Sequence, residues 1–322
     1  MQSEFETGDR SLANVWAKKY VGGLTDSDEM DAVVEMLERP AIAEKLASSL
    51  RFCSSQAWAK TEKLLFQELQ RHRIDPGLID PWKIAHDAQS LFDKALESYQ
   101  ADRSPEQFSV HIAKPCGQIR QSHTAHDPRV LGFLSMQFHY TSQFLLEELQ
   151  VGEREGIAKY LKVMDDHLYM PLQRSYEAAG NQPWDSAILH AVQQLLPVST
   201  SIAEMIADQV AAINPGYQCY TGSLDHPDVR ISSIRDIEMF QIYLCLCVLE
   251  GNITAVQEEL FPLCVMLYPP LKVHWNLVQQ LIFFLHQEVR KRLPFDDYQV
   301  FAPSLKMLGE MFSDDIFAGS PI

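Results

Sequence analysis

The sequence lacks the short motifs that mark common enzyme families. It contains no glycine-rich phosphate-binding loop, no dinucleotide-binding fingerprint, no H-E-x-x-H zinc motif and no G-x-S-x-G nucleophile turn. Its six cysteines are spread along the chain without a C-x-x-C pair. These absences weaken an enzymatic interpretation without removing it, because many helical enzymes carry no short signature. The sequence therefore predicts no catalytic residue and no cofactor.

Basic residues and long apolar runs are also scarce. Lysine and arginine number 27 against 43 acidic residues, and the formal net charge is −16. Such a charge repels phosphate backbones and anionic lipid surfaces, which argues against nucleic-acid and membrane-surface functions. The longest apolar run, 239–249, is shorter than the roughly 20 residues that cross a bilayer, so it predicts a buried core helix. With a polar, acidic N-terminus and no cysteine pairs, a reduced cytoplasmic protein is expected.

Alternating β-branched residues bounded by turns are missing, whereas helix signals are frequent. Asp80 before Pro81 predicts a helix start, with a capping aspartate and a proline in the first helical position. Ser201 and Glu204 have the spacing of a capping box. These patterns predict an all-α protein, a bundle of roughly a dozen helices without a significant β-sheet.

The breaks between helices suggest a division of the chain. Residues 1–102 form an N-terminal helical region, 103–130 an irregular connecting segment, and 131–322 a C-terminal helical domain. An alternative is that the two helical regions form one continuous domain. Within the second region, 131–149 and 157–179 are predicted to pair as an antiparallel hairpin.

Three consecutive polar residues, Asp165, Asp166 and His167, resemble a metal or acid–base site. On a helix over 157–179, Asp166 points away from the apolar stripe, and the other two lie on opposite flanks. Side chains that diverge in this way do not converge on one ion or substrate. The sequence therefore favours a solvated or partner-facing helix surface at this position.

The segment 103–130 is chemically the densest part of the chain. It holds four basic and two acidic residues, a positive region in an acidic protein. Three interpretations remain open: a structured loop, a basic docking surface, and a metal site. The docking residues would be Lys114, Arg120 and Arg129. The candidate metal ligands are Cys116, His123 and His126, although their spacing fits no known zinc pattern.

The stretch 214–232 is predicted to be a long loop, and long loops in compact domains are often functional. Tyr217 and Tyr220 are suited to anchoring an interface, and Arg230 would supply a polar contact. The alternative is a loop whose tyrosines pack on the protein's own core.

Two further stretches carry a resemblance to known proteins. The amino-acid sequences of 163–179 and 232–269 resemble those of a group of all-helical proteins of unknown activity from cyanobacteria. The resemblance covers the C-terminal half and implies a cytoplasmic protein of a photosynthetic bacterium. It implies no reaction, cofactor or site residue.

Together these features favour a non-enzymatic, all-helical interaction or regulatory protein that presents helical surfaces and loops to a protein partner or to a second copy of itself. Its negative charge favours a basic partner. The alternative is a helical ligand-binding or enzymatic domain that encloses an apolar or tetrapyrrole-like ligand, since such a site leaves no short motif.

Overall fold

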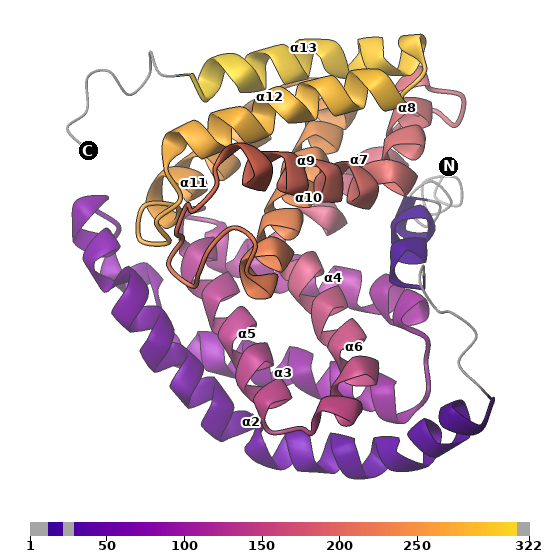
Figure 1. Ribbon diagram of the computed structural model, residues 1–322, viewed down its shortest axis with the longest axis vertical. Helices are drawn as coiled ribbons and strands as arrows, with labels where there is room; N and C mark the ends of the chain where they lie inside the picture. The colour runs from indigo at the N-terminus through magenta and orange to yellow at the C-terminus, as the bar shows by residue number, and fades with distance from the viewer. Residues whose placement is uncertain (1–11, 22–28, 314–322) are drawn as a thin grey trace. The chain divides into compact units, whose positions relative to one another are not determined.

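The protein is all-α, as predicted (Figure 1). A computed structural model describes residues 12–21 and 29–313, with the backbone alone described for 29–37. Within those ranges there are twelve α-helices, and the only β pairing is an isolated bridge between Gln218 and Ser223. The described helices are each too short or too polar to cross a bilayer.

Internal contacts divide the chain into two compact units. We call Trp16–Gln173 the N-terminal unit, and Arg174–Ile322 together with Met1–Val15 the C-terminal unit. The division near residue 173 differs from the predicted one, because the segment 103–130 lies inside the N-terminal unit.

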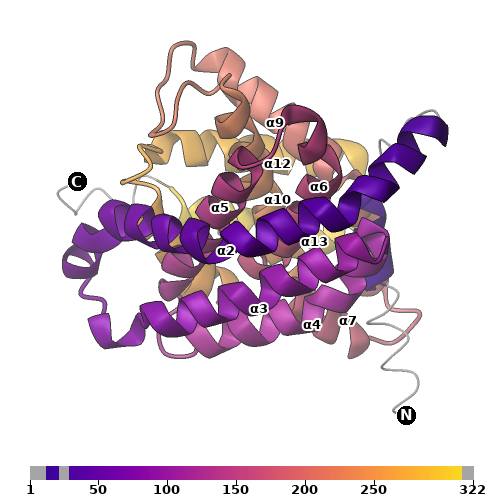
Figure 2. The ribbon, with the colours of Figure 1, turned by 90° about the horizontal axis from the view of Figure 1, so that it is seen from below.

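The N-terminal unit is built around one long helix. Curved α2 packs against both α3 and α5, and α3 lies beside α4 (Figure 2). Long helices that wrap around a core bend in this way, because carbonyl groups on the solvent side tilt towards water. The elements are η1 (Lys18–Tyr20), α2 (Glu29–Arg71), η2 (Pro76–Leu78), α3 (Pro81–Gln100), α4 (Pro105–Thr124), α5 (Val130–Glu147) and α6 (Val151–Tyr169).

Capping residues set the starts of α3 and α4. The Asp80 carboxylate accepts hydrogen bonds from the backbone N–H groups of Trp82 and Lys83, which confirms the predicted helix start. At α4, Ser104 and Gln107 form a reciprocal capping box. The prediction of an irregular segment at 103–130 is therefore wrong, because most of it is helix α4.

The C-terminal unit is built around α10. This helix is buried on all sides from 237 to 249, which confirms the predicted core helix. Gly251 ends it in a left-handed conformation (φ 68°) that glycine adopts without strain. The elements are α7 (Leu172–Gly180), α8 (Ala187–Leu195), η3 (Leu196–Val198), α9 (Ser199–Ile213), α10 (Pro227–Glu250), the π-helix η4 (Val256–Leu260), α11 (Phe261–Leu267), α12 (Trp275–Arg292) and α13 (Phe295–Met311).

One predicted capping box in this unit is wrong. α9 begins at Ser199, and the Ser201 hydroxyl donates to the carbonyl of Val198 instead of capping the helix. The predicted hairpin partner 157–179 is also interrupted, because α6 ends at Tyr169 and Pro171 disfavours helical geometry in the residue before it.

Gly117 marks a close approach inside the N-terminal unit. A Cβ atom at this position would lie 2.5 Å from the Cβ of Gln173. Because a Cβ atom cannot move without its backbone, Gly117→Ala is expected to lower the free energy of unfolding by about 2 kcal/mol, measured by urea denaturation. Helix propensity alone would give the opposite sign.

Two other helical glycines provide matched controls. A Cβ at Gly152 or Gly309 would meet no heavy atom within 4 Å. Each alanine substitution there is expected to be neutral or to stabilise the protein by up to about 1 kcal/mol. Equal effects at all three positions would show that Gly117 does not sit at a tight contact.

Candidate functional site

The connection between α9 and α10 is an ordered loop over 214–226. It is shorter than predicted, because residues 227–232 belong to α10. The Tyr217 hydroxyl donates to the carbonyl of Lys272 (2.7 Å) and accepts from the backbone N–H of His274 (2.9 Å). The backbone N–H of Tyr220 donates to the carbonyl of Leu271 (2.9 Å). The loop is therefore held against the 271–274 segment of the same unit.

These contacts separate the roles of the predicted anchor residues. Tyr217 is half-buried and uses its hydroxyl within the protein, as in the core-packing alternative. Tyr220 is 45% exposed. Arg230 lies in α10, where its Nε donates to Asp208 at 3.0 Å. Tyr220 is the predicted anchor that remains free to touch a partner through its ring.

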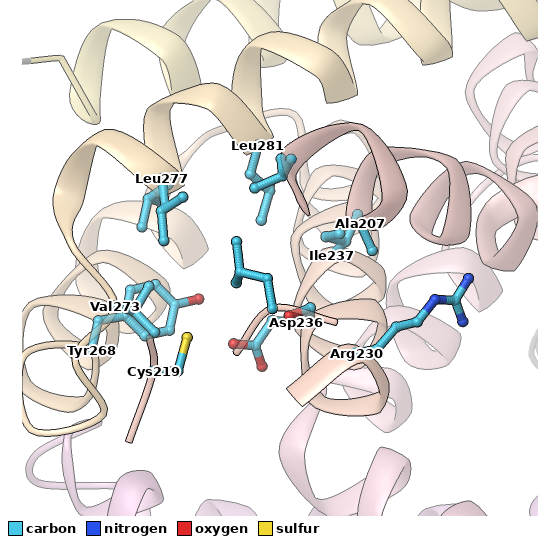
Figure 3. A pocket seen from close by; sticks show the side chains of 13 residues that line it. Ala207, Cys219, Arg230, Asp236, Ile237, Tyr268, Val273, Leu277 and Leu281 are labelled. Carbon is cyan, nitrogen blue, oxygen red and sulfur yellow. The ribbon is translucent and has the colours of Figure 1, made fainter. Parts of the chain in front are cut away.

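A small pocket lies behind this loop in the C-terminal unit (Figure 3). Its volume is about 70 Å³. Leu277 and Leu281 from α12 form one side, and the Asp236 carboxylate lies on the opposite side (Figure 3). The full lining is Ala207, Val210, Cys219, Leu224, Arg230, Ser233, Asp236, Ile237, Tyr268, Val273, Leu277, Val278 and Leu281. We call this cavity the loop pocket.

The chemistry of the loop pocket suits binding better than reaction. Burial raises the pKa of the Cys219 thiol, and the Asp236 carboxylate raises it further. Burial and the Asp236 carboxylate also raise the pKa of the Cys264 thiol. At neutral pH both thiols are protonated, and a protonated thiol is a poor nucleophile and a poor metal ligand.

The Asp165–Asp166–His167 sequence is not a solvated surface, and that prediction is wrong. All three side chains are buried, and Asp166 is 0% exposed. The C-terminal half of α6 lies in the interior of the N-terminal unit and is covered by other elements on its polar side as well. The helical wheel could not reveal this, because the groups that cover it come from distant parts of the sequence.

Asp166 is the centre of a buried charged cluster. Its carboxylate accepts from the Tyr20 hydroxyl (2.8 Å) and lies 3.1 Å from the Lys162 ammonium and 3.6 Å from that of Lys19. Burial raises the pKa of this carboxyl, but the two lysines and the tyrosine outweigh burial and lower the pKa to about 2. The cluster therefore ties the η1 segment to α6, and its carboxylate has no access to solvent.

His167 is buried beside this cluster as a neutral ring. Its Nδ1 lies 2.8 Å from the carbonyl of Val163, and its Nε2 lies 3.3 Å from the Ser109 hydroxyl. Burial lowers the pKa of the ring to about 4, against the opposing effects of the Val163 carbonyl and the Asp166 carboxylate.

The candidate docking residues of 103–130 are mostly engaged inside the N-terminal unit. Arg120 is buried and donates to the carbonyls of Leu168 (3.1 Å) and Tyr169 (2.5 Å), at the C-terminal end of α6. Arg129 forms an ion pair with Asp127 and donates a hydrogen bond to the backbone carbonyl of His72 (2.8 Å). Lys114 is exposed. A basic docking surface made by all three residues is therefore not supported.

The candidate metal ligands are likewise separated. Cys116 is buried, and burial raises the pKa of its thiol far above the usual range. His123 is hydrogen-bonded to Asp87 at 2.7 Å, and burial lowers its pKa, whereas His126 is exposed. Among the described residues, no three cysteine, histidine or carboxylate side chains are grouped so that they could hold a metal ion.

Comparison with known proteins does not assign the chain to a family. No family model matches the chain, and neither a curated protein nor a solved structure shows significant similarity to it.

Proposed function

We propose that this chain is a non-enzymatic interaction protein whose C-terminal unit binds a protein partner at the loop pocket. The observation that carries the proposal is the combination of a fixed loop, an exposed Tyr220 ring and an apolar pocket beside them. A rigid loop loses little conformational entropy on binding, and tyrosine supplies a large contact area at low entropic cost.

The size of the loop pocket indicates its occupant. A volume of about 70 Å³ is roughly half of the 150 Å³ that holds a benzene molecule. A single aliphatic side chain of a partner, such as leucine or valine, fits this space, and the leucines of α12 would bury it. A tetrapyrrole needs several hundred Å³, so this pocket does not favour the alternative of an enclosed large ligand.

Charge supports a basic partner. The Asp236 carboxylate faces the pocket, and the whole chain has a net charge of −16. Complementary charge accelerates encounter and orients the partner before the apolar contact forms. We therefore expect a lysine or arginine close to the aliphatic anchor in the partner's sequence.

The test fills the pocket. Proteins captured from native cell extract by the wild-type chain are identified, and their affinities for Ala207→Leu and Tyr220→Ala are then measured. We expect Ala207→Leu to weaken binding by at least tenfold, because the added carbons occupy the space of the anchor. Tyr220→Ala is expected to cost about 2 kcal/mol of binding free energy without changing the melting temperature.

Phe283 gives the matched control. It is an exposed aromatic residue of the same unit that does not line the pocket. Phe283→Ala should leave the affinity unchanged. Full affinity of the folded Ala207→Leu variant would rule out the loop pocket as the docking site.

A further inference from the structure

A second surface of the C-terminal unit, apart from the loop pocket, has the features of a binding groove. It lies between the first turns of α8 and α13, which pack against each other, and has a volume of about 670 Å³. The lining residues are Trp184, Asp185, Ser186, Ala187, His190, Gln193, Pro294, Asp296, Asp297 and Val300. We call it the Trp184 groove.

The groove presents a large aromatic face to solvent. Trp184 is 73% exposed, and Phe295, which does not line the groove but lies in the chain between the lining residues Pro294 and Asp296, is exposed to the same degree. Ala187, Pro294 and Val300 add apolar surface between the two helix starts. Exposed tryptophan at the edge of a concave surface is typical of binding sites, since indole contributes more binding energy than most side chains.

The charged groups of the groove are predominantly acidic. Asp297 is buried and bonded to His190 at 2.8 Å. Asp185 and Asp296 are exposed, and neither forms an ion pair with any described residue. Two carboxylates therefore remain available next to the indole.

The basic residues that precede α13 do not neutralise these carboxylates. Lys291 and Arg292, at the end of α12, both pair with the buried Glu288, at 3.5 and 3.0 Å. Neither these two residues nor Arg290, the third basic residue in the last turn of α12, lines the groove. The negative charge of the groove is thus uncompensated within its own lining.

We propose that the Trp184 groove binds an arginine side chain from a basic segment of a partner protein. A guanidinium group stacks on an aromatic face and forms paired hydrogen bonds with a carboxylate, and one arginine can make both contacts. Its aliphatic stem would lie along Ala187, Pro294 and Val300. Lysine satisfies the charge but cannot reproduce the planar stacking and the paired bonds.

The experiment uses the full chain and a fluorescein-labelled hexa-arginine peptide, with binding followed by fluorescence anisotropy at about 150 mM salt, where charges beyond a Debye length are screened. Trp184→Ala and the double variant Asp185→Asn/Asp296→Asn are each expected to weaken binding at least fivefold. A hexa-lysine peptide is expected to bind the wild-type chain at least threefold more weakly than hexa-arginine.

Controls separate a site from general attraction to an acidic protein. Glu204→Gln/Glu258→Gln removes the same charge from exposed positions of the same unit, and Trp82→Ala removes an 86% exposed tryptophan elsewhere. Both should change the affinity less than twofold. Equal losses in the two double variants, unchanged binding by Trp184→Ala, or no binding by the wild type would overturn the proposal. The loop-pocket variant Ala207→Leu should not affect this assay, so the two proposals can fail separately.

Discussion

Replacing Asp166 with asparagine is expected to lower the free energy of unfolding by about 3 kcal/mol. The substitution keeps the shape of the side chain but removes the charge that holds Lys19 and Lys162. The Lys19 side chain is 11% exposed, so water cannot fully replace the interaction with Asp166. Urea denaturation, with hydrogen exchange of the α6 amides, measures the loss.

A surface ion pair on the same helix provides the control. Glu155 and Lys159 are four residues apart on α6, and the Glu155 side chain is 85% exposed. Glu155→Gln is expected to cost less than about 0.5 kcal/mol. A loss below about 1 kcal/mol for Asp166→Asn would show that the buried cluster does not hold the N-terminal unit together.

The pH dependence of the Asp166 contribution follows from its pKa. The carboxyl titrates at about 2 in the folded protein and at an ordinary value of 3.8 when unfolded. Its stabilising contribution is therefore complete above pH 3.8 and is lost as the pH falls towards 2. The Asp166→Asn variant should lack this part of the acid transition.

The fold class could be predicted from the sequence because it depends on local signals. Asp80 before Pro81 caps a helix whatever its surroundings, and the apolar run 239–249 has to be buried. The sequence was a poor guide where a capping pattern falls inside a continuous helix, because the same spacing occurs there without a helix start. Ser201 has the spacing of a capping residue, but the helix had already started at Ser199.

The surroundings of α6 could not be predicted, because a helical wheel shows apolar residues but not the partners of polar ones. Asp166 and His167 are buried by groups that lie 146 and 58 residues away in the sequence, Tyr20 and Ser109. Only the tertiary fold brings them together. A pair of adjacent carboxylates followed by histidine is equally compatible with exposure and with a satisfied buried cluster.

The candidate site was partly predictable. Length and tyrosine content predict a loop at 214–232, and the structure has a loop there over 214–226, since α10 starts at Pro227. The sequence could not tell which tyrosine points outward. The α12 leucines that line the loop pocket lie about sixty residues beyond the loop and looked like ordinary core positions. The exposure of Trp184 could not be predicted, because an isolated tryptophan in the sequence is equally compatible with burial.

Acid is expected to destabilise the N-terminal unit well above the pH at which carboxylates titrate, and His167 is the reason. Its pKa is about 4 when folded and 6.5 when unfolded, so the folded state binds fewer protons between these values. Stability is then fully present above pH 6.5 and is lost as the pH falls to 4. The pKa difference corresponds to about 3 kcal/mol for this fully buried ring.

The variant His167→Gln separates this effect from other sources of acid sensitivity. At pH 7 it is expected to be less stable than the wild type, because the hydrogen bonds with Val163 and Ser109 are disturbed. As the pH falls from 6.5 to 4, the stability of the variant should nevertheless fall less than that of the wild type. Burial also lowers the pKa of His123 and His72, so part of the slope remains in the variant. Urea denaturation at a series of pH values measures the slope, and an unchanged slope in His167→Gln would mean that this ring does not remain neutral in the folded protein at pH values below 6.5.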